Sequence, residues 1–581
     1  MAVGADVCPT TGDPWPDAGP AVPDVRVVRV RADAAPDGAD GSAERPFPTI
    51  AAALAGASGA TRVLLADGEH EAPPRVEGAV TIRGRCAARA ILGGPPSTAP
   101  VAIEGASSRV ELVGVTVRDR GVRIAGATAA LRGVVIARAT GVSLRVSRSA
   151  AVELRDVFLD GTVLGAGVER GGLFVDGGAT VDGERVAVRG THRLGVLSAA
   201  RVTLRDVTVR GTIRAAATES AQGAIAQSGG SLSLTQAHFE DTIGSAVLVT
   251  QAGTTATLSS CVLRRVTPAS ATSAGSGLTV SRGAVATLRG SLVEAAGGLG
   301  VYARDAGTRL ELSLSTLRRN GLPATGALEV SSGNGAATVV AGVAITDTAG
   351  VALHATGAGA SLRATSVRVE RVGQDAMGRG ARGLLAQEGA TLTATDVRVT
   401  DVTGVAASAV SKGSRLSLDR VVIAGGGAPS TEPTFPEGVA VAALFGGAVE
   451  AARVRVARAH TTGVLAYGAG ATVALEGSRV EGVAGRRDRA GHGALAVEGG
   501  ALTLRGVTVR EATGSALNAA GDGSRASVDG VVLEATRAGP TASGALQAQS
   551  GGVVEGARVA VRGNATGGVL AVGASRVTLA E

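Results

Sequence analysis

The sequence predicts an all-β protein, a single-stranded, right-handed parallel β-helix with three short strands per coil. Residues 500–520, GALTLRGVTVREATGSALNAA, contain three short runs of alternating apolar side chains separated by two tight corners. Alternation with a period of two is typical of strands that bury one face. The same unit recurs from about residue 101 to the end of the chain, which predicts a solenoid of about 18–20 coils.

One strand of each coil is expected to open with glycine and to be followed by a paired run, such as RVTLRDVTVR at 201–210 or TLTATDVRVT at 391–400. Three strands per coil follow from this pattern, each with one side facing inward. The opening glycines are Gly121, Gly141, Gly172, Gly195, Gly223, Gly244, Gly277, Gly300, Gly326, Gly350, Gly383, Gly404, Gly438, Gly463, Gly493, Gly514, Gly544 and Gly568.

Short and long coils alternate from residue 141 onward, so the complete unit spans about 54 residues. The additional residues precede an opening glycine, as in GTVLGAGVERG at 161–171 and GGGAPSTEPTFPEG at 425–438. Stacking is expected to align these longer loops along one edge. Insertions in repeat proteins often mark the binding face, so the sequence predicts a loop-lined binding edge.

The N-terminal hundred residues differ from the repeat. Residues 1–24 are rich in proline and predict a flexible tail, and residues 25–100 predict a cap and the first coils. Thr49 is a suitable N-cap for a short helix over 50–55 that would cover the end of the stack. Strands are expected at 25–30, 62–66, 79–83 and 90–92.

The segment from Asp37 to Cys86 resembles a known family. Its strings DGADGS, RPFPTI, AAAL, VLLADGEH and VTIRGRC are similar to the start of secreted bacterial right-handed parallel β-helix repeat proteins of the pectin-lyase-like superfamily. The resemblance covers about fifty residues. It implies the fold and export from the cell more than any particular reaction.

Composition restricts the function. The chain has 581 residues with nine aromatic side chains and 87 glycines, so Val, Leu, Ile and Ala must fill a narrow interior. The net charge is +7 and Lys412 is the only lysine. Arginines are spaced singly along the strands without interleaved aromatics, which argues against nucleic-acid binding. The sequence contains no run of eighteen apolar residues, so it predicts no membrane-spanning helix.

The three cysteines, Cys8, Cys86 and Cys261, lack the spacing of a zinc site. Two alternatives remain open: a Cys8–Cys86 disulfide that attaches the tail to the first coils, or three unpaired thiols. Cys261 lies in an alternating run and is expected to be buried. The first residues do not form a signal peptide, and we expect one upstream of this methionine.

Candidate site residues are few. Asp156, Asp206 and Asp396 occupy a turn position that is glycine in other coils, so turn residues are favoured over a cation-binding ladder of carboxylates. Asp33, Asp37 and Asp40 form the densest acidic group and the one candidate calcium site.

Other motifs favour structural roles. His492 lies in a GHG string like that of polygalacturonases, but no paired carboxylates accompany it, and a loop position is expected. The aromatic residues Phe174, Tyr302, Phe445 and Tyr467 are expected to fill the core.

The sequence therefore predicts a non-catalytic, secreted or cell-surface scaffold, with no cofactor and with a polysaccharide or cell-envelope component as partner. One alternative is a polysaccharide lyase or glycoside hydrolase acting on uronate-type polymers. Another is a filament that associates end to end, because Glu581 ends inside a paired run with no capping element.

Overall fold

We describe a computed structural model of the chain. The structure describes residue 8 and residues 15–55, 59–94, 99–163, 169–214, 221–270, 274–321, 327–374, 381–425, 438–485, 490–537, 544–565 and 567–581. The chain divides into two compact units, Met1–Leu278 with Ala284–Ala286, and Thr279–Gly283 with Thr287–Glu581. Each unit is a stack of coils built from parallel strands, as the sequence predicts.

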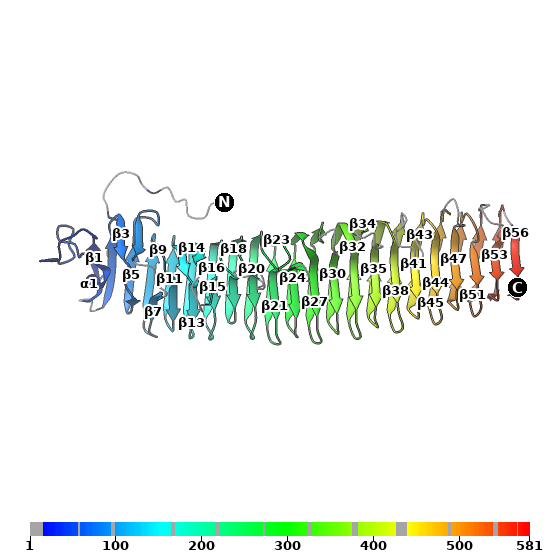
Figure 1. The fold of residues 1–581 in the computed structure, drawn as a ribbon, viewed down its shortest axis with the longest axis horizontal. Helices are drawn as coiled ribbons and strands as arrows, with labels where there is room; N and C mark the ends of the chain where they lie inside the picture. Colours follow the sequence, from blue (N-terminus) through cyan, green and yellow to red (C-terminus); the bar gives the residue numbers. More distant parts are fainter. Residues whose placement is uncertain are drawn as a thin grey trace. The chain divides into compact units, whose positions relative to one another are not determined.

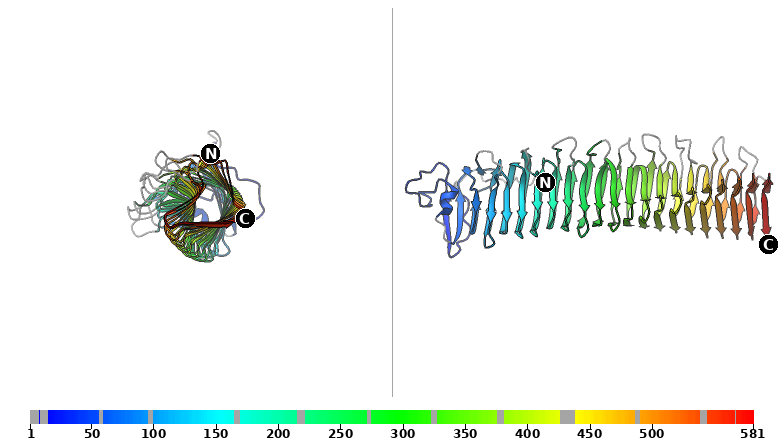
Figure 2. Two further views of the ribbon diagram at one scale, coloured as in Figure 1. Left: turned by 90° about the vertical axis from the view of Figure 1, so that its right-hand side faces the viewer. Right: turned by 60° about the horizontal axis from the view of Figure 1, so that its bottom comes forward.

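Each coil has three faces. Face 1 contains the strands that follow the opening glycines, and faces 2 and 3 contain the two halves of the paired run. Successive coils pair in parallel, residue for residue, as in Arg201↔Ser231 through Arg210↔Glu240. The chain is therefore a parallel β-helix, and Figure 2 shows the coils of each unit stacked on one another.

In the first unit, face 1 contains β4 Arg75–Val76, β7 Val101–Glu104, β10 Val122–Ala125, β13 Val142–Ser147, β15 Gly171–Val175, β17 Leu194–Ser198, β19 Gln222–Ala226 and β21 Ser245–Thr250. Face 2 contains β1 Val25–Val30, β2 Ala60–Leu65, β5 Ala79–Arg83, β8 Arg109–Val113, β11 Thr128–Arg132, the first halves of β14 Ala151–Val163, β16 Thr180–Arg189, β18 Arg201–Arg210 and β20 Ser231–Glu240, and β22 Thr255–Ser259. Face 3 contains β3 Gly68–Glu71, β6 Ala90–Gly93, β9 Thr116–Arg118, β12 Val135–Thr140, the second halves of β14, β16, β18 and β20, and β23 Val262–Val266.

Residues of β24 Gly275–Ser281 and β25 Val285–Arg289 are divided between the units. In the second unit, face 1 contains β27 Gly298–Arg304, β30 Ala327–Gly333, the second half of β32 Ala344–Thr356, β35 Arg382–Gln387, β38 Val405–Val410, β41 Val439–Leu444, β44 Thr462–Tyr467, β47 His492–Val497, β50 Leu517–Ala520, β53 Gly544–Gln549 and β56 Gly567–Val572. Face 2 contains β28 Arg309–Ser313, β31 Ala337–Ala341, β33 Ser361–Thr365, β36 Thr391–Thr395, β39 Arg415–Asp419, β42 Ala448–Ala452, β45 Thr472–Glu476, β48 Ala501–Arg505, β51 Arg525–Asp529, β54 Val553–Ala557 and β57 Arg576–Ala580. Face 3 contains β26 Leu292–Ala296, β29 Thr316–Arg318, the first half of β32, β34 Arg368–Gly373, β37 Arg398–Val402, β40 Val422–Ala424, β43 Arg455–Ala457, β46 Arg479–Glu481, β49 Thr508–Arg510, β52 Val532–Glu534 and β55 Ala560–Arg562.

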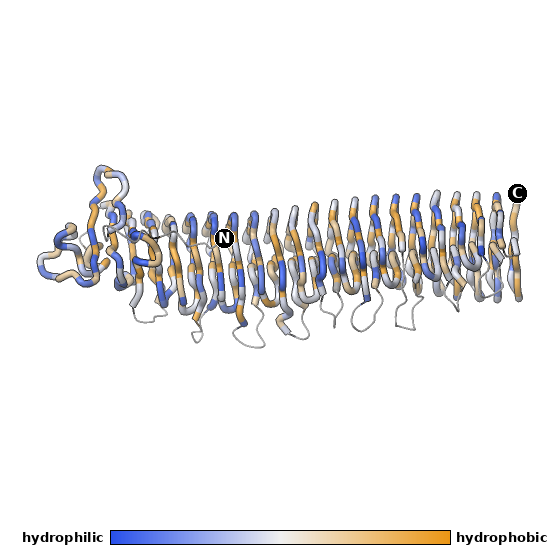
Figure 3. The backbone as a smooth tube through the Cα atoms, turned by 90° about the horizontal axis from the view of Figure 1, so that it is seen from above, coloured by the Kyte–Doolittle hydropathy of each residue, from blue (hydrophilic) through white to orange (hydrophobic). Residues whose placement is uncertain are grey.

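The core lies inside the coils. In β18, Val207 and Val209 point inward and are buried, whereas Arg205, Thr208 and Arg210 point outward. This alternation continues from coil to coil, and Figure 3 shows hydrophobic and hydrophilic positions alternating along the chain. The period-two pattern thus identifies the inward side chains correctly.

The opening glycines are required by close packing. A Cβ on Gly493 would lie 2.2 Å from Cγ1 of Val509 and 2.6 Å from the carbonyl oxygen of Ala516 in the next coil. Gly195 meets a similar valine and carbonyl group. Apart from Gly326, which is outside the described residues, every predicted opening glycine lies within a face 1 strand or at most three residues before it.

The N-terminal predictions hold for the helix and for the four expected strands, which correspond to β1, β2, β5 and β6. The helix α1, Ile50–Ala55, begins where Thr49 Oγ1 accepts a hydrogen bond from the backbone N–H of Ala52 at 3.1 Å, and it contacts β1 and β2. The strand β3 was not predicted.

The described part of the expected tail is attached rather than free. The ring of Trp15 lies 5.9 Å from the guanidinium of Arg29 and 5.4 Å from that of Arg31, and Arg62 donates a hydrogen bond to the carbonyl of Ala18. These contacts hold residues 15–20 against the first coils.

The longer loops that were expected to form a binding edge lie largely outside the described residues, including 164–168, 215–220, 375–380 and 426–437. That edge stays a prediction. Among the described residues, no helix is long and apolar enough to cross a membrane.

Candidate functional site

The three repeated aspartates are corner residues, as the sequence favours. Asp156, Asp206 and Asp396 have φ of 55°, 53° and 54° at the corner between faces 2 and 3. Asp156 accepts hydrogen bonds of 2.6 and 2.9 Å from Arg185, the corner residue of the next coil. These hydrogen bonds lower the pKa of Asp156 despite its partial burial. Asp396 accepts hydrogen bonds of 2.6 and 2.8 Å from Arg420 in the same way, so Asp156 and Asp396 belong to an Asp–Arg ladder that joins coils.

The acidic group Asp33, Asp37 and Asp40 does not converge. Asp40 accepts hydrogen bonds from Nη2 of Arg45 at 2.5 Å and from the backbone N–H of Ser42 at 2.9 Å, and Asp33 lies 3.9 Å from Arg31. In the described ranges, no three His, Cys, Asp or Glu side chains gather closely enough to hold a metal ion. Asp40 is thus paired with an arginine side chain.

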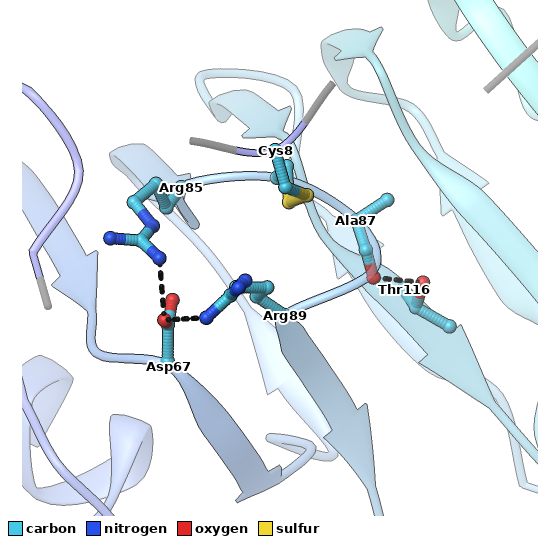
Figure 4. The surroundings of a disulfide bond; sticks show 7 residues. Cys8, Asp67, Arg85, Ala87, Arg89 and Thr116 are labelled. Atoms are coloured by element: carbon cyan, nitrogen blue, oxygen red, sulfur yellow. Dashed lines mark hydrogen bonds and ion pairs between the residues drawn. A yellow bond between two sulfur atoms is a disulfide. The ribbon is translucent and has the colours of Figure 1, made fainter. Parts of the chain in front are cut away.

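Cys8 and Cys86 form a disulfide with a Cα–Cα distance of 5.9 Å (Figure 4). Beside it, Asp67 accepts hydrogen bonds from Arg85 at 2.9 Å and Arg89 at 3.1 Å. Cys261 is not part of this disulfide and is buried, as expected, and burial raises the pKa of its thiol to about 11. Of the two alternatives left by the sequence, the structure contains the disulfide.

His492 is not a loop residue. It is the first residue of β47, and burial lowers the pKa of its imidazole to about 4, so the ring is neutral at pH 7. The prediction was wrong by one residue, because the strand begins before the opening glycine, Gly493, rather than at it.

Of the four aromatic side chains expected in the core, Phe174 is buried, in a hydrophobic cluster with Leu194 and Ile225, and the prediction was wrong for the other three. Tyr302 alternates with buried residues of β27 and therefore lies on the outer side of face 1. Tyr467 lies on the outer side of β44, and Phe445, at a corner, is 50% exposed. Phe239 is also buried, and its ring occupies the space left by Gly223.

One organised polar group on the surface is a set of three arginines around Glu481, on the outer side of face 3. Arg455 donates to Oε1 of Glu481 at 2.8 and 2.5 Å, and Arg510 donates to Oε2 at 3.1 and 2.8 Å. The Nε of Arg479 lies 2.8 Å from Oε2. We call these four residues the arginine cluster.

In the arginine cluster the glutamate is buried, and the arginine side chains are exposed to solvent. The Glu481 side chain is 9% exposed, whereas those of Arg455 and Arg479 are 61% and 43% exposed. Burial alone would raise the pKa of Glu481, but hydrogen bonds from Arg455 and Arg510 outweigh it and lower that pKa. Three guanidinium groups share one carboxylate, so positive charge is left over and faces solvent. This arrangement suits a carboxylate or sulfate group of a ligand.

A shallow depression of about 350 Å³ lies on face 2 of the same coils. Small side chains, Ala452 and Ala474, form part of its surface, and Glu450, Glu476 and Thr503 project beside them. Gly477, where an added Cβ would meet nothing within 4 Å, forms the corner between Glu476 on face 2 and Arg479 on face 3. No corner side chain therefore separates the depression from the arginine cluster in this coil.

The sequence analysis missed the arginine cluster for a specific reason. Glu481 and Arg510 are 29 residues apart, and only the pairing Glu481↔Arg510 between β46 and β49 places them together. The alternation does predict that Arg479 and Glu481 lie on the outer side. Because coil lengths vary, however, the sequence does not show which residues of successive coils pair.

A buried carboxyl group was also missed. Glu329 in β30 is fully buried, and its oxygens accept hydrogen bonds from the Asn320 side-chain amide at 2.6 Å and the Thr348 hydroxyl at 2.5 Å. Burial raises the pKa of Glu329 to about 7, although these hydrogen bonds oppose the shift.

No family model and no curated protein matches the chain. Similar solved structures include pectate lyase Pel9A (9% identity, 57% of this chain and 78% of that chain, TM-score 0.33) and the PL6 family alginate lyase AlyGC (10%, 96% and 99%, 0.25). Another is the catalytic unit of a GH87 α-1,3-glucanase from Streptomyces thermodiastaticus (13%, 71% and 64%, 0.28). The fold is read from the strand pairing itself, and these likenesses carry no argument about the site.

Proposed function

We propose that the chain is a non-catalytic, secreted or cell-surface scaffold that binds an acidic polysaccharide. The arginine cluster is the observation that carries this proposal. Its exposed guanidinium groups are oriented by the buried Glu481, so little side-chain entropy is lost when they bind a carboxylate. Export is an expectation from the sequence that fits such a ligand.

The charge of the neighbouring depression narrows the ligand. Three carboxylates line it, from Asp419, Glu450 and Glu476, against one arginine, Arg505, and this excess of negative charge would repel a polymer that carries a carboxylate on every sugar. A heteropolysaccharide in which uronates alternate with uncharged or amino sugars avoids this repulsion, because an uncharged sugar can lie over the depression. We therefore favour such a heteropolymer over a homopolymer of uronates.

The test is calorimetric titration of the full chain with three polymers: a hyaluronan-type heteropolymer, polygalacturonate and a neutral glucan. We expect affinity to fall in that order and to weaken with added salt. Arg455→Gln with Arg479→Gln should weaken binding about tenfold, since charged hydrogen bonds contribute roughly 1.5–3 kcal/mol. Arg510 stays in this variant to pair with Glu481.

Arg368→Gln with Arg398→Gln is the matched control, because both arginines project from the same face, in β34 and β37, and the change removes the same charge. It should change affinity less than about twofold. Equal losses in both variants would reduce the effect to net charge, and no binding to any acidic polymer would refute the proposal.

One observation favours a second candidate, a glycoside hydrolase. Glu450 in β42 pairs with Ala474 in β45, and Glu476 is two residues further along. The Cα atoms of such diagonal neighbours lie about 7–8 Å apart, a spacing from which two glutamate side chains can reach the roughly 6.5–9.5 Å between the carboxyl groups of inverting glycosidases. Release of reducing ends that Glu450→Gln and Glu476→Gln both abolish would establish this activity over the non-catalytic proposal.

End-to-end self-association stays a proposal as well. Light scattering over a range of protein concentrations tests it, and a constant monomer mass would exclude it.

A further inference from the structure

Phe445 combines exposure with an unfavourable backbone conformation. It lies at the corner between β41 and β42, its φ is 50°, and half of its surface is exposed. A left-handed conformation is unusual for a bulky side chain, and such strain is concentrated at ligand-binding and catalytic positions. The equivalent corner residues of neighbouring coils are smaller or more polar: Ser411, Gly468 and Glu498.

A second aromatic ring accompanies Phe445. The ring of Tyr467, at the end of β44, lies 5.4 Å from that of Phe445 and is nearly perpendicular to it, at 84°. A hydrogen bond with Glu498 raises the pKa of the Tyr467 hydroxyl. The corner therefore presents an apolar ring face next to a hydroxyl and a carboxylate, and such a combination matches a sugar ring, which has an apolar face and hydroxyl groups at its edge.

The position relates this corner to the proposed ligand site. In one coil the chain runs from Phe445 through β42 to Arg455, and in the next coil from Tyr467 through β45 to Arg479. The depression lies on β42 and β45, between the aromatic corner and the arginine cluster in chain order. A five-residue strand spans about 17 Å, a distance that an oligosaccharide of a few sugars covers.

We propose that Phe445 and Tyr467 form a platform on which one sugar ring of the bound polysaccharide packs. This inference rests on the proposed function, because it assigns an additional subsite to the same ligand. The occupant is a pyranose ring that presents its apolar face to Phe445, with hydroxyl groups directed to Glu498 and the Tyr467 hydroxyl.

Phe445→Gly separates a binding role from a structural one. Glycine occurs at this corner in the next coil and tolerates positive φ, so the melting temperature should stay the same or rise. Binding of the heteropolymer should weaken about fivefold or more. The matched control is Leu314→Gly, since Leu314 is also a large apolar residue at a corner, with φ of 49° and 60% exposure. It should leave binding unchanged.

Fluorescence provides a direct readout. The chain has a single tryptophan, Trp15, so Phe445→Trp adds one reporter at the platform. Addition of the heteropolymer should shift the emission of this variant to shorter wavelength, and the wild-type emission should not change.

The outcomes are distinct. A wild-type chain that binds no acidic polymer refutes the proposed function. If the wild type binds and the arginine variant is impaired, but Phe445→Gly binds normally, the platform is refuted while the proposed function stands. A fall in melting temperature for Phe445→Gly without loss of affinity, or a change confined to self-association, also overturns the platform.

Discussion

Asn320 donates a hydrogen bond of 2.6 Å from its side-chain amide to the carboxyl group of Glu329 inside a coil of the second unit. The Oδ1 of Asn320 accepts a hydrogen bond from the backbone N–H of Ala296 in the preceding coil at 2.8 Å. Gly300 makes room for both side chains, because a Cβ there would lie 2.9 Å from Glu329 Oε2. A carboxyl group is thus built into an interior that is otherwise almost entirely aliphatic.

Glu329 predicts a pH-dependent stability. Its pKa in the folded chain is about 7, above the ordinary value of 4.5, so the fold prefers the protonated form. The unfolding free energy should therefore fall as pH rises from about 4.5 to 7, by roughly 3 kcal/mol in total. Glu329→Gln should abolish this part of the pH dependence and be the more stable protein at pH 8. Urea unfolding of both proteins at pH 5 and pH 8 measures the free energy of unfolding. The same change with pH in the wild type and in Glu329→Gln would contradict the prediction.

The opening glycines predict a steric effect. Gly493→Ala should destabilise the chain by roughly 1–3 kcal/mol, because the new methyl group meets Val509 and the carbonyl of Ala516. Gly567→Ala is the control, since nothing lies within 4 Å of its added Cβ. Thermal unfolding of both variants is the measurement. Equal shifts in melting temperature would show that contacts with the added methyl group do not explain the need for glycine at this position.

The Asp–Arg ladder predicts that backbone conformation matters more than the ion pair. Asp156→Gly should change stability by less than about 0.5 kcal/mol, because glycine adopts the φ of 55° readily and exposed ion pairs contribute little. Asp156→Ala should cost about 1–2 kcal/mol, since alanine has neither advantage. Denaturant unfolding distinguishes the two, and a larger loss for the glycine variant would assign the stability to the Arg185 pair instead.

Removal of the disulfide should reduce stability more than the corner substitutions do. Cys8 and Cys86 are separated by 78 residues, and closing a loop of that size is worth about 4.5 kcal/mol in the chain-entropy model. Cys8→Ser with Cys86→Ser should therefore lower the stability of the first unit. Cys261→Ser serves as the cysteine control in that unit, with an expected loss of less than about 1.5 kcal/mol. Proteolysis of the N-terminal coils after mild heating reports the difference.

The sequence alone predicted the architecture because the same pattern of alternating apolar residues and glycines recurs in coil after coil. Alternation identified the inward side chains of strands such as β18, and the glycines identified where face 1 begins. The corner aspartates and the helix after Thr49 were also accessible, since turn and capping chemistry is local. Period two could not decide on which side of face 1 Phe174 and Tyr302 lie, because both sides of that face are largely apolar.

The candidate site could not be predicted in the same way. The arginine cluster depends on register between coils: Glu481 pairs directly with Arg510, and Arg455, which pairs with Arg479, lies diagonally across from Glu481. Variable coil lengths remove any fixed spacing that would show this in the sequence. Likewise, Asn320 and Glu329 are close along the chain, but nothing in the sequence shows that the carboxyl group points inward. Sequence determined a parallel β-helix through local periodicity; tertiary structure decided which charges meet, because stacking brings together side chains that are 20 to 30 residues apart.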